Sequence, residues 1–231
     1  MSRDPRGTAE RTNSNVRAFE DFLQGWLVRQ EHYLEELRST LATCHESKEE
    51  DLRDLITRVL AHYQEYFEEK SRIANYDVFL VFSSPWCSSF ERSFFWIAGV
   101  KPNLAFRLVS NSVEDLSGDQ VERMKRLKAE TMVEERELGD ELARIQESVA
   151  APPILELARR MARAEECDQV ESAMETLKME MGVVVANADM LRTRTAVRVA
   201  DILTPVQNLK FLTALTEFQM KVRVLGSLLN R

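Results

Sequence analysis

Residue types that could hold a metal ion are few and scattered along this chain. It contains three histidines and three cysteines, and only Cys44 and His45 are adjacent. A structural zinc ion needs four such ligands at workable spacing. A di-iron bundle would need Glu-x-x-His motifs, but the residues three positions before the histidines are Arg29, Ala42 and Val59. We therefore predict no metal site, and we interpret His32, His45 and His62 as surface or partly buried side chains.

Residues for covalent or acid–base catalysis are equally poorly organised. The chain has no G-x-S-x-G elbow, no P-loop and no G-x-G-x-x-G loop. Cys87 lies among aromatic residues, where a free cysteine usually packs as a small hydrophobe. Acidic clusters such as Glu134–Glu137 are typical of a solvated helix face, and no carboxylate pair is set apart for general acid–base work. The sequence therefore predicts a protein that is not an enzyme.

Length and composition favour a helical protein. The chain has 231 residues, 44% of them apolar, but only seven Gly and six Pro, too few for a sheet-rich fold with many tight turns. This length suits one large domain. An odd number of cysteines without a C-x-x-C pair indicates a reducing compartment. The longest apolar runs, 78–82 and 94–100, are far shorter than the ~20 residues that cross a bilayer, so we expect no membrane partner.

The charge pattern argues against direct binding to nucleic acid. The formal net charge is −7, whereas phosphate contact depends mainly on Lys and Arg. Two basic clusters occur, at 123–128 and 192–198, but acidic residues are interleaved with both, as in i,i+4 ion pairing. The dense basic region that precedes a leucine zipper is missing from residues 1–17. We expect no nucleic-acid partner for this chain alone.

Hydrophobic periodicity predicts an all-α fold, a single domain of long antiparallel helices. Residues 1–15 carry almost nothing apolar and are expected to form a disordered leader, with the helical domain over 16–231. One uninterrupted helix is predicted over 49–82, ended by Pro85. Another helix is predicted to begin after Ser117, because Gln120 three residues later completes a capping box.

Residues 85–110 form the most aromatic part of the chain. Gly99 and Pro102 predict a short helix, a tight corner and a second short helix. Core packing explains most such aromatic residues, but they also dominate partner surfaces and apolar pockets. Both interpretations stay open. The residues that we assign to a candidate partner or pocket surface are Trp86, Phe90, Phe94, Trp96 and Arg107.

The last predicted helix carries apolar residues at 4-3-4-3-4 spacing, the pattern used for helix–helix packing. This C-terminal seam consists of Phe211, Leu215, Phe218, Val222, Leu225 and Leu229. It either packs inside its own domain or forms an interface with a second copy or another protein.

A set of short motifs occurs in a fixed order along most of the chain. The longest stretch is 86–102, which reads W-C-S-S-F-E-R-S-F-F-W-I-A-G-V-K-P and is followed by Phe106-Arg107-Leu108. The other landmarks are Phe19, Phe22, Trp26, Leu116, Ser117, Gln120, A-D-x-L-R-x-x-T at 188–195, I-L-T-P-x-Q at 202–207, and Phe211-Leu212. In this order the motifs resemble the plant Delay of Germination domain, which also forms the C-terminal part of the TGA class of bZIP transcription factors. The resemblance covers about residues 16–226.

The resemblance implies an all-α interaction module in plant transcription regulation and in hormone or developmental signalling, such as abscisic acid signalling and seed dormancy. The implied protein partners are TGA-type bZIP factors or type 2C phosphatases, together with a homodimer. The implied location is the nucleus, with the cytoplasm as a second. Because this chain shows no basic region, it resembles family members that regulate without a DNA reader of their own.

The resemblance also implies where a cofactor would bind. A haem-binding member of this family uses two histidines, four residues apart, in its final helix. The corresponding positions here are Gln219 and Arg223, neither of which is a usual haem ligand, so we expect no cofactor. Two other functions stay open. One is a part of a sequence-specific DNA-binding complex, through dimerisation with TGA bZIP partners, and the other is a sensor of haem or of an apolar small molecule.

Overall fold

The computed structural model describes residues 5–45, 48–149 and 168–229, and every regular element within these ranges is an α-helix. This confirms the predicted all-α fold. The helices are α1 (Pro5–Ala42), α2 (Glu49–Tyr76), α3 (Val78–Ser83), α4 (Ser89–Arg92), α5 (Leu104–Ser112), α6 (Gly118–Val149), α8 (Asp168–Ile202) and α9 (Pro205–Leu229).

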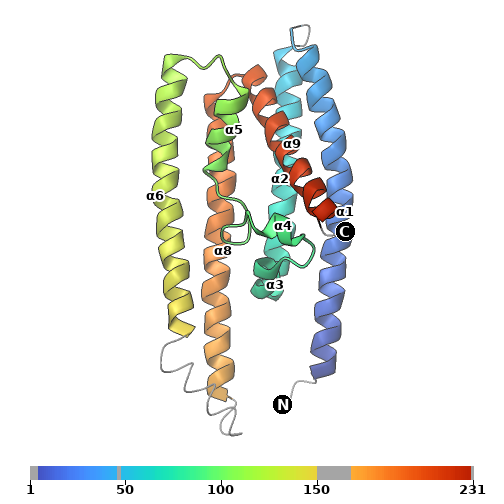
Figure 1. Ribbon diagram of the computed structural model, residues 1–231, viewed down its shortest axis with the longest axis vertical. Helices are drawn as coiled ribbons and strands as arrows, with labels where there is room; N and C mark the ends of the chain where they lie inside the picture. Colours follow the sequence, from blue (N-terminus) through green and yellow to red (C-terminus); the bar gives the residue numbers. More distant parts are fainter. Residues whose placement is uncertain (1–4, 46–47, 150–167, 230–231) are drawn as a thin grey trace.

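Two antiparallel pairs of long helices run along the molecule (Figure 1). α1 pairs with α2 and α6 pairs with α8, while α9 crosses α1 and α2 obliquely. The chain passes from one pair to the other through the short helices α3, α4 and α5 (Figure 1). α3 contacts α2 and α8, α4 contacts α9, and α5 contacts α8 and α9. The segment 85–110 therefore lies on the path from one helix pair to the other. Its two short helices, α4 and α5, form the predicted helical corner.

The apolar core has two parts along this length. One part contains Leu37 of α1, Val59 of α2 and Phe211 of α9, all with no exposed surface. The other contains Phe19 of α1 and Val184 of α8, again almost fully buried. Each long helix thus buries one apolar stripe, and burial of each large apolar side chain contributes about 1.5–3 kcal/mol.

The starts of α6 and α9 are both fixed by capping boxes. The Ser117 hydroxyl accepts from the Gln120 amide at 3.2 Å, and the Gln120 side-chain oxygen accepts from the Ser117 amide at 3.0 Å, which confirms the predicted cap. Thr204 and Gln207 repeat this arrangement at α9. Gln120 Nε2 then donates to Gln207 Oε1 at 2.8 Å, so the two caps hold each other in place.

The single helix predicted over 49–82 is wrong. α2 ends at Tyr76, Asp77 is extended (φ −152°), and α3 begins at Val78. The Asp77 carboxylate accepts from the Phe79 amide at 3.1 Å. This side-chain hydrogen bond to a nearby backbone amide competes with the backbone hydrogen bonds that would continue the helix. The spacing of apolar residues does not predict such a bond.

The N-terminal end of α1 lies within the range for which a leader is expected, and the division into a leader and a helical domain over 16–231 stays a prediction. α1 begins at Pro5, inside the range 1–15 expected to form a disordered leader, while residues 1–4 lie outside the described part of the chain. Adding a residue to an existing helix costs far less free energy than nucleating one, so a helix that is packed farther along can continue through a polar segment.

Candidate functional site

Residues 85–110, here called the aromatic corner, begin with a sharp turn. Ser84 adopts the left-handed conformation (φ 40°) directly before Pro85, which ends α3 as predicted. α4 then starts with a capping box, in which Ser88 Oγ accepts from the Glu91 amide at 3.1 Å and Glu91 Oε2 accepts from the Ser88 amide at 2.7 Å.

α9 lies directly against this short helix. The other carboxylate oxygen of Glu91 forms an ion pair with Arg223 of α9 at 3.1 Å. Gly226, one turn later, lies so close to Ser88 that a Cβ atom there would be 2.1 Å from the Ser88 hydroxyl oxygen. A charge pair and a close backbone approach therefore hold α9 on the aromatic corner.

A buried arginine of α8 anchors the other end of the corner. Ile97 and Ala98 have positive φ angles of 46° and 55°, which non-glycine residues rarely adopt. The Arg192 side chain donates to the carbonyl oxygens of Trp96, Ile97 (2.9 Å) and Val100 (2.7 Å). These charge-assisted bonds stabilise a loop that would otherwise leave its carbonyl groups unpaired in the interior.

Arg192 belongs to a buried charge cluster. Asp189 Oδ1 accepts from Arg192 and, at 2.8 Å, from Lys70 Nζ of α2. Burial lowers the pKa of Lys70 to about 8, although the neighbouring Asp189 carboxylate acts in the opposite direction. Lys70 thus stays protonated near neutral pH. The Asp189 carboxylate links α8 to Lys70 of α2 and, through Arg192, to the aromatic corner.

A second buried network joins α1, α2 and α9. Gln30 donates to the Tyr63 hydroxyl at 2.7 Å and to Gln219 Oε1 at 3.1 Å. Tyr63 is also 2.9 Å from Gln219 Oε1 and 3.0 Å from the Thr216 hydroxyl, and burial raises the pKa of Tyr63. Gln219, at the first position implied for haem ligation, therefore acts as an acceptor in a structural network, and Arg223, at the second, pairs with Glu91.

The residues assigned to the candidate surface have different environments. Trp86 is buried, with its ring 4.2 Å from that of Phe19, so it belongs to the core. Phe90 and Phe94 form an edge-to-face pair at 5.1 Å, and Phe94 is 46% exposed.

The remaining two members make no ring contact with this pair among the described contacts. Trp96 is half-buried, with the Arg192 guanidinium 5.5 Å from its ring centre and the Lys101 ammonium 6.0 Å away. Arg107 lies on the exposed side of α5. Of the five residues, Phe90 and Phe94 alone form a ring pair with each other among the described contacts.

The C-terminal seam is divided between core and surface. Phe211 is fully buried, and Leu215 and Phe218 pack against the same core. Val222 is half-buried beside the aromatic corner. Beyond it, Leu225 and Leu229 are exposed, together with two further apolar side chains on the same end of α9. This surface, here called the α9 tip, consists of Val224, Leu225, Leu228 and Leu229.

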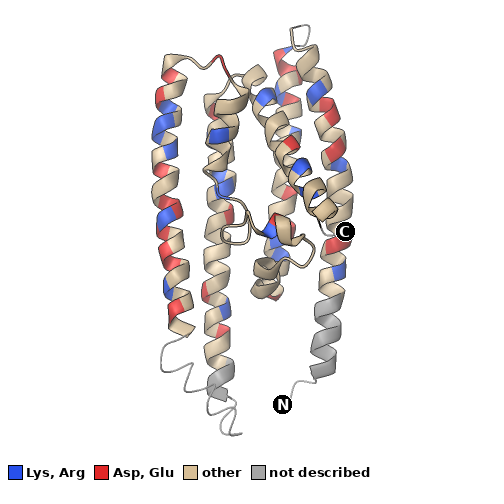
Figure 2. Ribbon diagram, viewed as in Figure 1, with Lys and Arg blue, Asp and Glu red and all other residues tan. Residues whose placement is uncertain are grey.

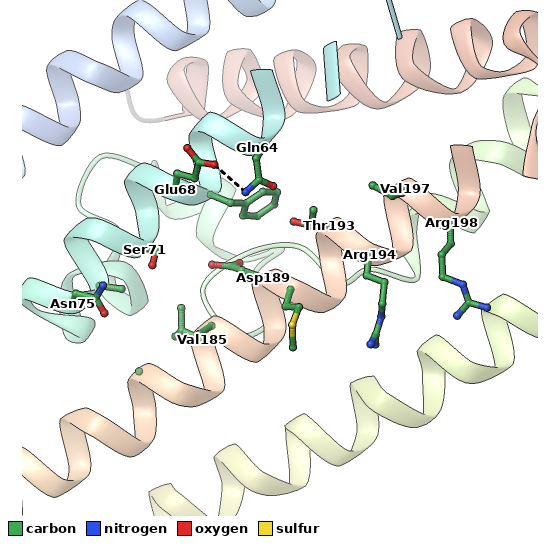
Figure 3. A pocket seen from close by; sticks show the side chains of 15 residues that line it. Gln64, Glu68, Ser71, Asn75, Val185, Asp189, Thr193, Arg194, Val197 and Arg198 are labelled. Atoms are coloured by element: carbon green, nitrogen blue, oxygen red, sulfur yellow. Dashed lines mark hydrogen bonds between the residues drawn. The ribbon is translucent and has the colours of Figure 1, made fainter. Parts of the chain in front are cut away.

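Two grooves run beside α2, and neither was predicted. One, of about 410 Å³, lies between α2, the start of α5, α8 and α9 and is lined mainly by apolar residues such as Leu60, Pro102 and Leu215. The other, of about 650 Å³, separates α2 from α8 (Figure 3). The position of a groove depends on which helices pack side by side. The spacing of apolar residues along one helix does not predict this.

Histidine and cysteine side chains are not gathered at these grooves. His32 and His45 are exposed, and no group of three metal-ligating side chains occurs in the part of the chain that the structure describes. His62 is buried and stacked on Trp26, and burial lowers its pKa to about 4. Burial likewise raises the pKa of the Cys87 thiol to about 12, so at neutral pH it is not a thiolate nucleophile.

None of the described helices combines the length and apolar character needed to cross a bilayer.

Comparison with known proteins places the chain among plant relatives. A family model described as DOG1, seed dormancy control, matches residues 33–111. Protein ZW2 of Arabidopsis thaliana is 36% identical over 225 residues, which cover 92% of this chain and 98% of the relative. Protein RESPONSE TO ABA AND SALT 1 of the same plant is 36% identical over 220 residues, covering 91% of this chain and 95% of the relative. Transcription factor TGA2.3 of Oryza sativa subsp. japonica is 27% identical over 227 residues, 96% of this chain and 67% of that factor.

The fold and these relatives together define a class of all-helical regulatory proteins. Some relatives are longer transcription factors that contain the same domain. The chain belongs to the DOG1 family. The relatives are regulators and transcription factors, and none indicates an enzyme family.

Proposed function

We propose that this protein is a non-enzymatic, partner-binding regulator that acts in the plant nucleus, in transcription regulation and in hormone-linked or developmental signalling. The transcription-factor relatives support a nuclear setting, and the names of the family model and of one relative refer to seed dormancy and to ABA and salt. The partners that the resemblance implies are TGA-type bZIP factors or type 2C phosphatases.

The observation that carries this proposal is the exposed α9 tip. Its four apolar side chains are 48–67% exposed, although α4 and the partly buried Arg223–Glu91 pair hold another side of the helix. A contiguous apolar patch on a fixed helix is typical of a protein-binding surface. Phe94, whose ring borders the cavity between α9 and the corner, adds an aromatic residue of the kind that dominates binding energy.

Two substitutions on one helix test the proposal. Phe218→Asp places a charge against the core and should unfold the protein, whereas Leu225→Asp should leave it folded. We expect Leu225→Asp to weaken binding to a purified TGA-type bZIP factor or type 2C phosphatase at least ~tenfold in isothermal titration calorimetry. Met132→Asp, on the exposed face of α6, is the matched control and should bind like wild type. Wild-type affinity of Leu225→Asp for both partners would contradict this use of the α9 tip.

The charge distribution supports a role without direct DNA binding. Both positive and negative side chains occur along α6 and along α8 (Figure 2). Arg194 and Arg198 of α8 pair with Glu134 and Glu130 of α6. A salt-dependent shift of a TGACG duplex by this chain alone would favour the DNA-binding alternative. We expect no shift even at low salt.

The final helix does not fit haem. Gln219 and Arg223 are engaged by Tyr63 and Glu91 at the two positions that would carry the ligating histidines. We expect hemin to give no Soret shift typical of histidine ligation. If such a shift appeared and was lost when His32, His45 and His62 were replaced by Ala, the cofactor-binding alternative would be favoured.

An apolar small molecule remains a second candidate, because the groove of about 410 Å³ has the size of a ligand pocket and an apolar lining. The probe anilinonaphthalene sulfonate would then bind the native protein with micromolar affinity. Ala61→Trp, at an exposed position on the groove wall, should abolish that binding. Unchanged probe fluorescence in this variant would argue against the groove as a ligand site.

A further inference from the structure

α8 carries a row of apolar and small residues that none of the described helices covers. The row follows 4-3-4-3-4 spacing, the seam of an antiparallel or parallel helix pair. Its four large members are 42–64% exposed. The α8 row consists of Met179, Val183, Ala186, Met190, Thr193 and Val197.

The neighbours of α8 leave this row open. α6 packs on one side, with Arg194 reaching Glu134, and α2 packs on the other, where Lys70 meets Asp189. The groove of about 650 Å³ between α2 and α8 runs along the row, and Thr193 and Val197 line it (Figure 3). A helix lying on the row would contact α8 with one face and the exposed polar side chains of α2 with another.

The sizes of the side chains match a second α8 in the reverse direction. In a two-fold pair centred at residue 188, Met190 of one copy lies opposite Ala186 of the other, so a large side chain meets a small one. Val183 lies opposite Thr193, and Met179 lies opposite Val197, which gives the alternating layers of an antiparallel coiled coil.

The charges beside the row match the same register. In the heptad that this row defines, Glu180, Asn187 and Arg194 occupy the flanking position that meets its equivalent in an antiparallel pair. Glu180 of one copy then faces Arg194 of the other, twice by symmetry, and the two Asn187 side chains meet near the axis. Arg194 is 44% exposed while it pairs with Glu134, so its guanidinium has a free edge for a second carboxylate.

We propose that two copies of this chain associate antiparallel through the α8 row. This inference deepens the proposed function by naming a second copy as one partner, and it uses a surface separate from the α9 tip. The row spans 18 helical steps, about 27 Å. One helix pair of this length is small for a permanent dimer, so we expect a micromolar, reversible association.

Sedimentation velocity of the full chain across the micromolar range tests the dimer. Wild type should shift from monomer to dimer, and Met190→Glu should raise the dissociation constant at least ~tenfold by placing a charge in the row. Val133→Glu, at a 53% exposed position on α6, is the matched control and should dimerise like wild type. Circular dichroism checks that each variant stays helical.

A charge exchange tests the register. Glu180→Arg and Arg194→Glu each place like charges opposite each other, so each variant alone should be monomeric. An equimolar mixture restores both opposite-charge pairs and should form a heterodimer. The proposal would be overturned by any one of three results. These are a wild type that stays monomeric, a dimer that is lost on Leu225→Asp but not on Met190→Glu, and a charge-exchange mixture that does not associate. In contrast, failure of the bZIP or phosphatase titrations would leave this association intact and would count only against the proposed function.

Discussion

The Nε atom of Arg192 donates a hydrogen bond to the carbonyl oxygen of Val100, 2.7 Å away and 92 residues earlier in the chain. The same guanidinium holds the left-handed residues Ile97 and Ala98 in place through neighbouring carbonyl groups. Gly99 lies against it, since a Cβ atom there would be 3.0 Å from Arg192 Cζ. The shape of the aromatic corner thus depends on one side chain of α8.

Arg192→Met should strongly destabilise the protein. It removes a buried positive charge from Asp189 and leaves several carbonyl groups of the corner without a donor, and breaking such a buried pair typically costs about 3–5 kcal/mol. Urea unfolding at neutral pH measures the loss. The control is Arg198→Met, whose ion pair with Glu130 is nearly half exposed, and it should cost less than ~1 kcal/mol. Equal effects of the two changes would contradict the anchoring role.

Gly226→Ala and Gly182→Ala should have opposite effects, although both remove a glycine from a helix interior. Helix propensity favours alanine by about 1 kcal/mol at each site. At Gly182 nothing lies within 4 Å of the new Cβ atom, so the free energy of unfolding should rise.

At Gly226 the new Cβ atom would meet the Ser88 hydroxyl, which is engaged in the α4 cap, so α9 must shift and stability should fall by roughly 1–3 kcal/mol. Thermal unfolding of the two variants under identical conditions measures the contrast. A stabilised Gly226→Ala protein would show that α9 is not held closely on α4.

His62 should make the protein less stable in mild acid. Burial lowers its pKa from 6.5 to about 4, so between these values the unfolded chain binds more protons than the native protein. The contribution of neutral His62 is therefore fully present above about pH 6.5 and is lost as the pH falls toward 4, by up to about 3 kcal/mol.

His62→Phe keeps a ring against Trp26 and removes this titration, so its free energy of unfolding should depend less steeply on pH over that window. Urea unfolding at several pH values measures the slope. His32→Phe, at an exposed position on α1, is the matched substitution. If it flattened the slope as much as His62→Phe, the buried ring would not be the cause.

Cys87 should react slowly with iodoacetamide in the native protein. Burial raises the pKa of its thiol to about 12, and the Glu91 carboxylate adds to this, so little thiolate is present at pH 8. Peptide mapping by mass spectrometry should find Cys44 labelled first and Cys87 labelled only after denaturation. Rapid native labelling of Cys87 would contradict the raised pKa of this half-buried thiol.

Much of the secondary structure was predictable because local signals carry it. The Ser117–Gln120 cap, the stop at Pro85 and the short helices of residues 85–110 each depend on residues within a few positions of one another. Asp77 is the exception, since its side chain ends α2 inside an apolar stripe that continues on both sides. The candidate surface was less predictable. Trp86 and Phe94 have similar sequence surroundings, yet one is in the core and the other is 46% exposed.

By itself, the sequence determined that this protein is helical, which residues share a face of each helix, and which family it resembles. Only the tertiary structure decided which faces are covered. Arg192 belonged to a basic cluster by its position in the sequence, but folding buried it beside Asp189 and Val100. The C-terminal seam was recognisable from its spacing, whereas the equally regular α8 row became notable only once its exposure was known. The spacing of apolar residues specifies which face of a helix they share. Which helix packs on that face depends on contacts between residues far apart in the chain.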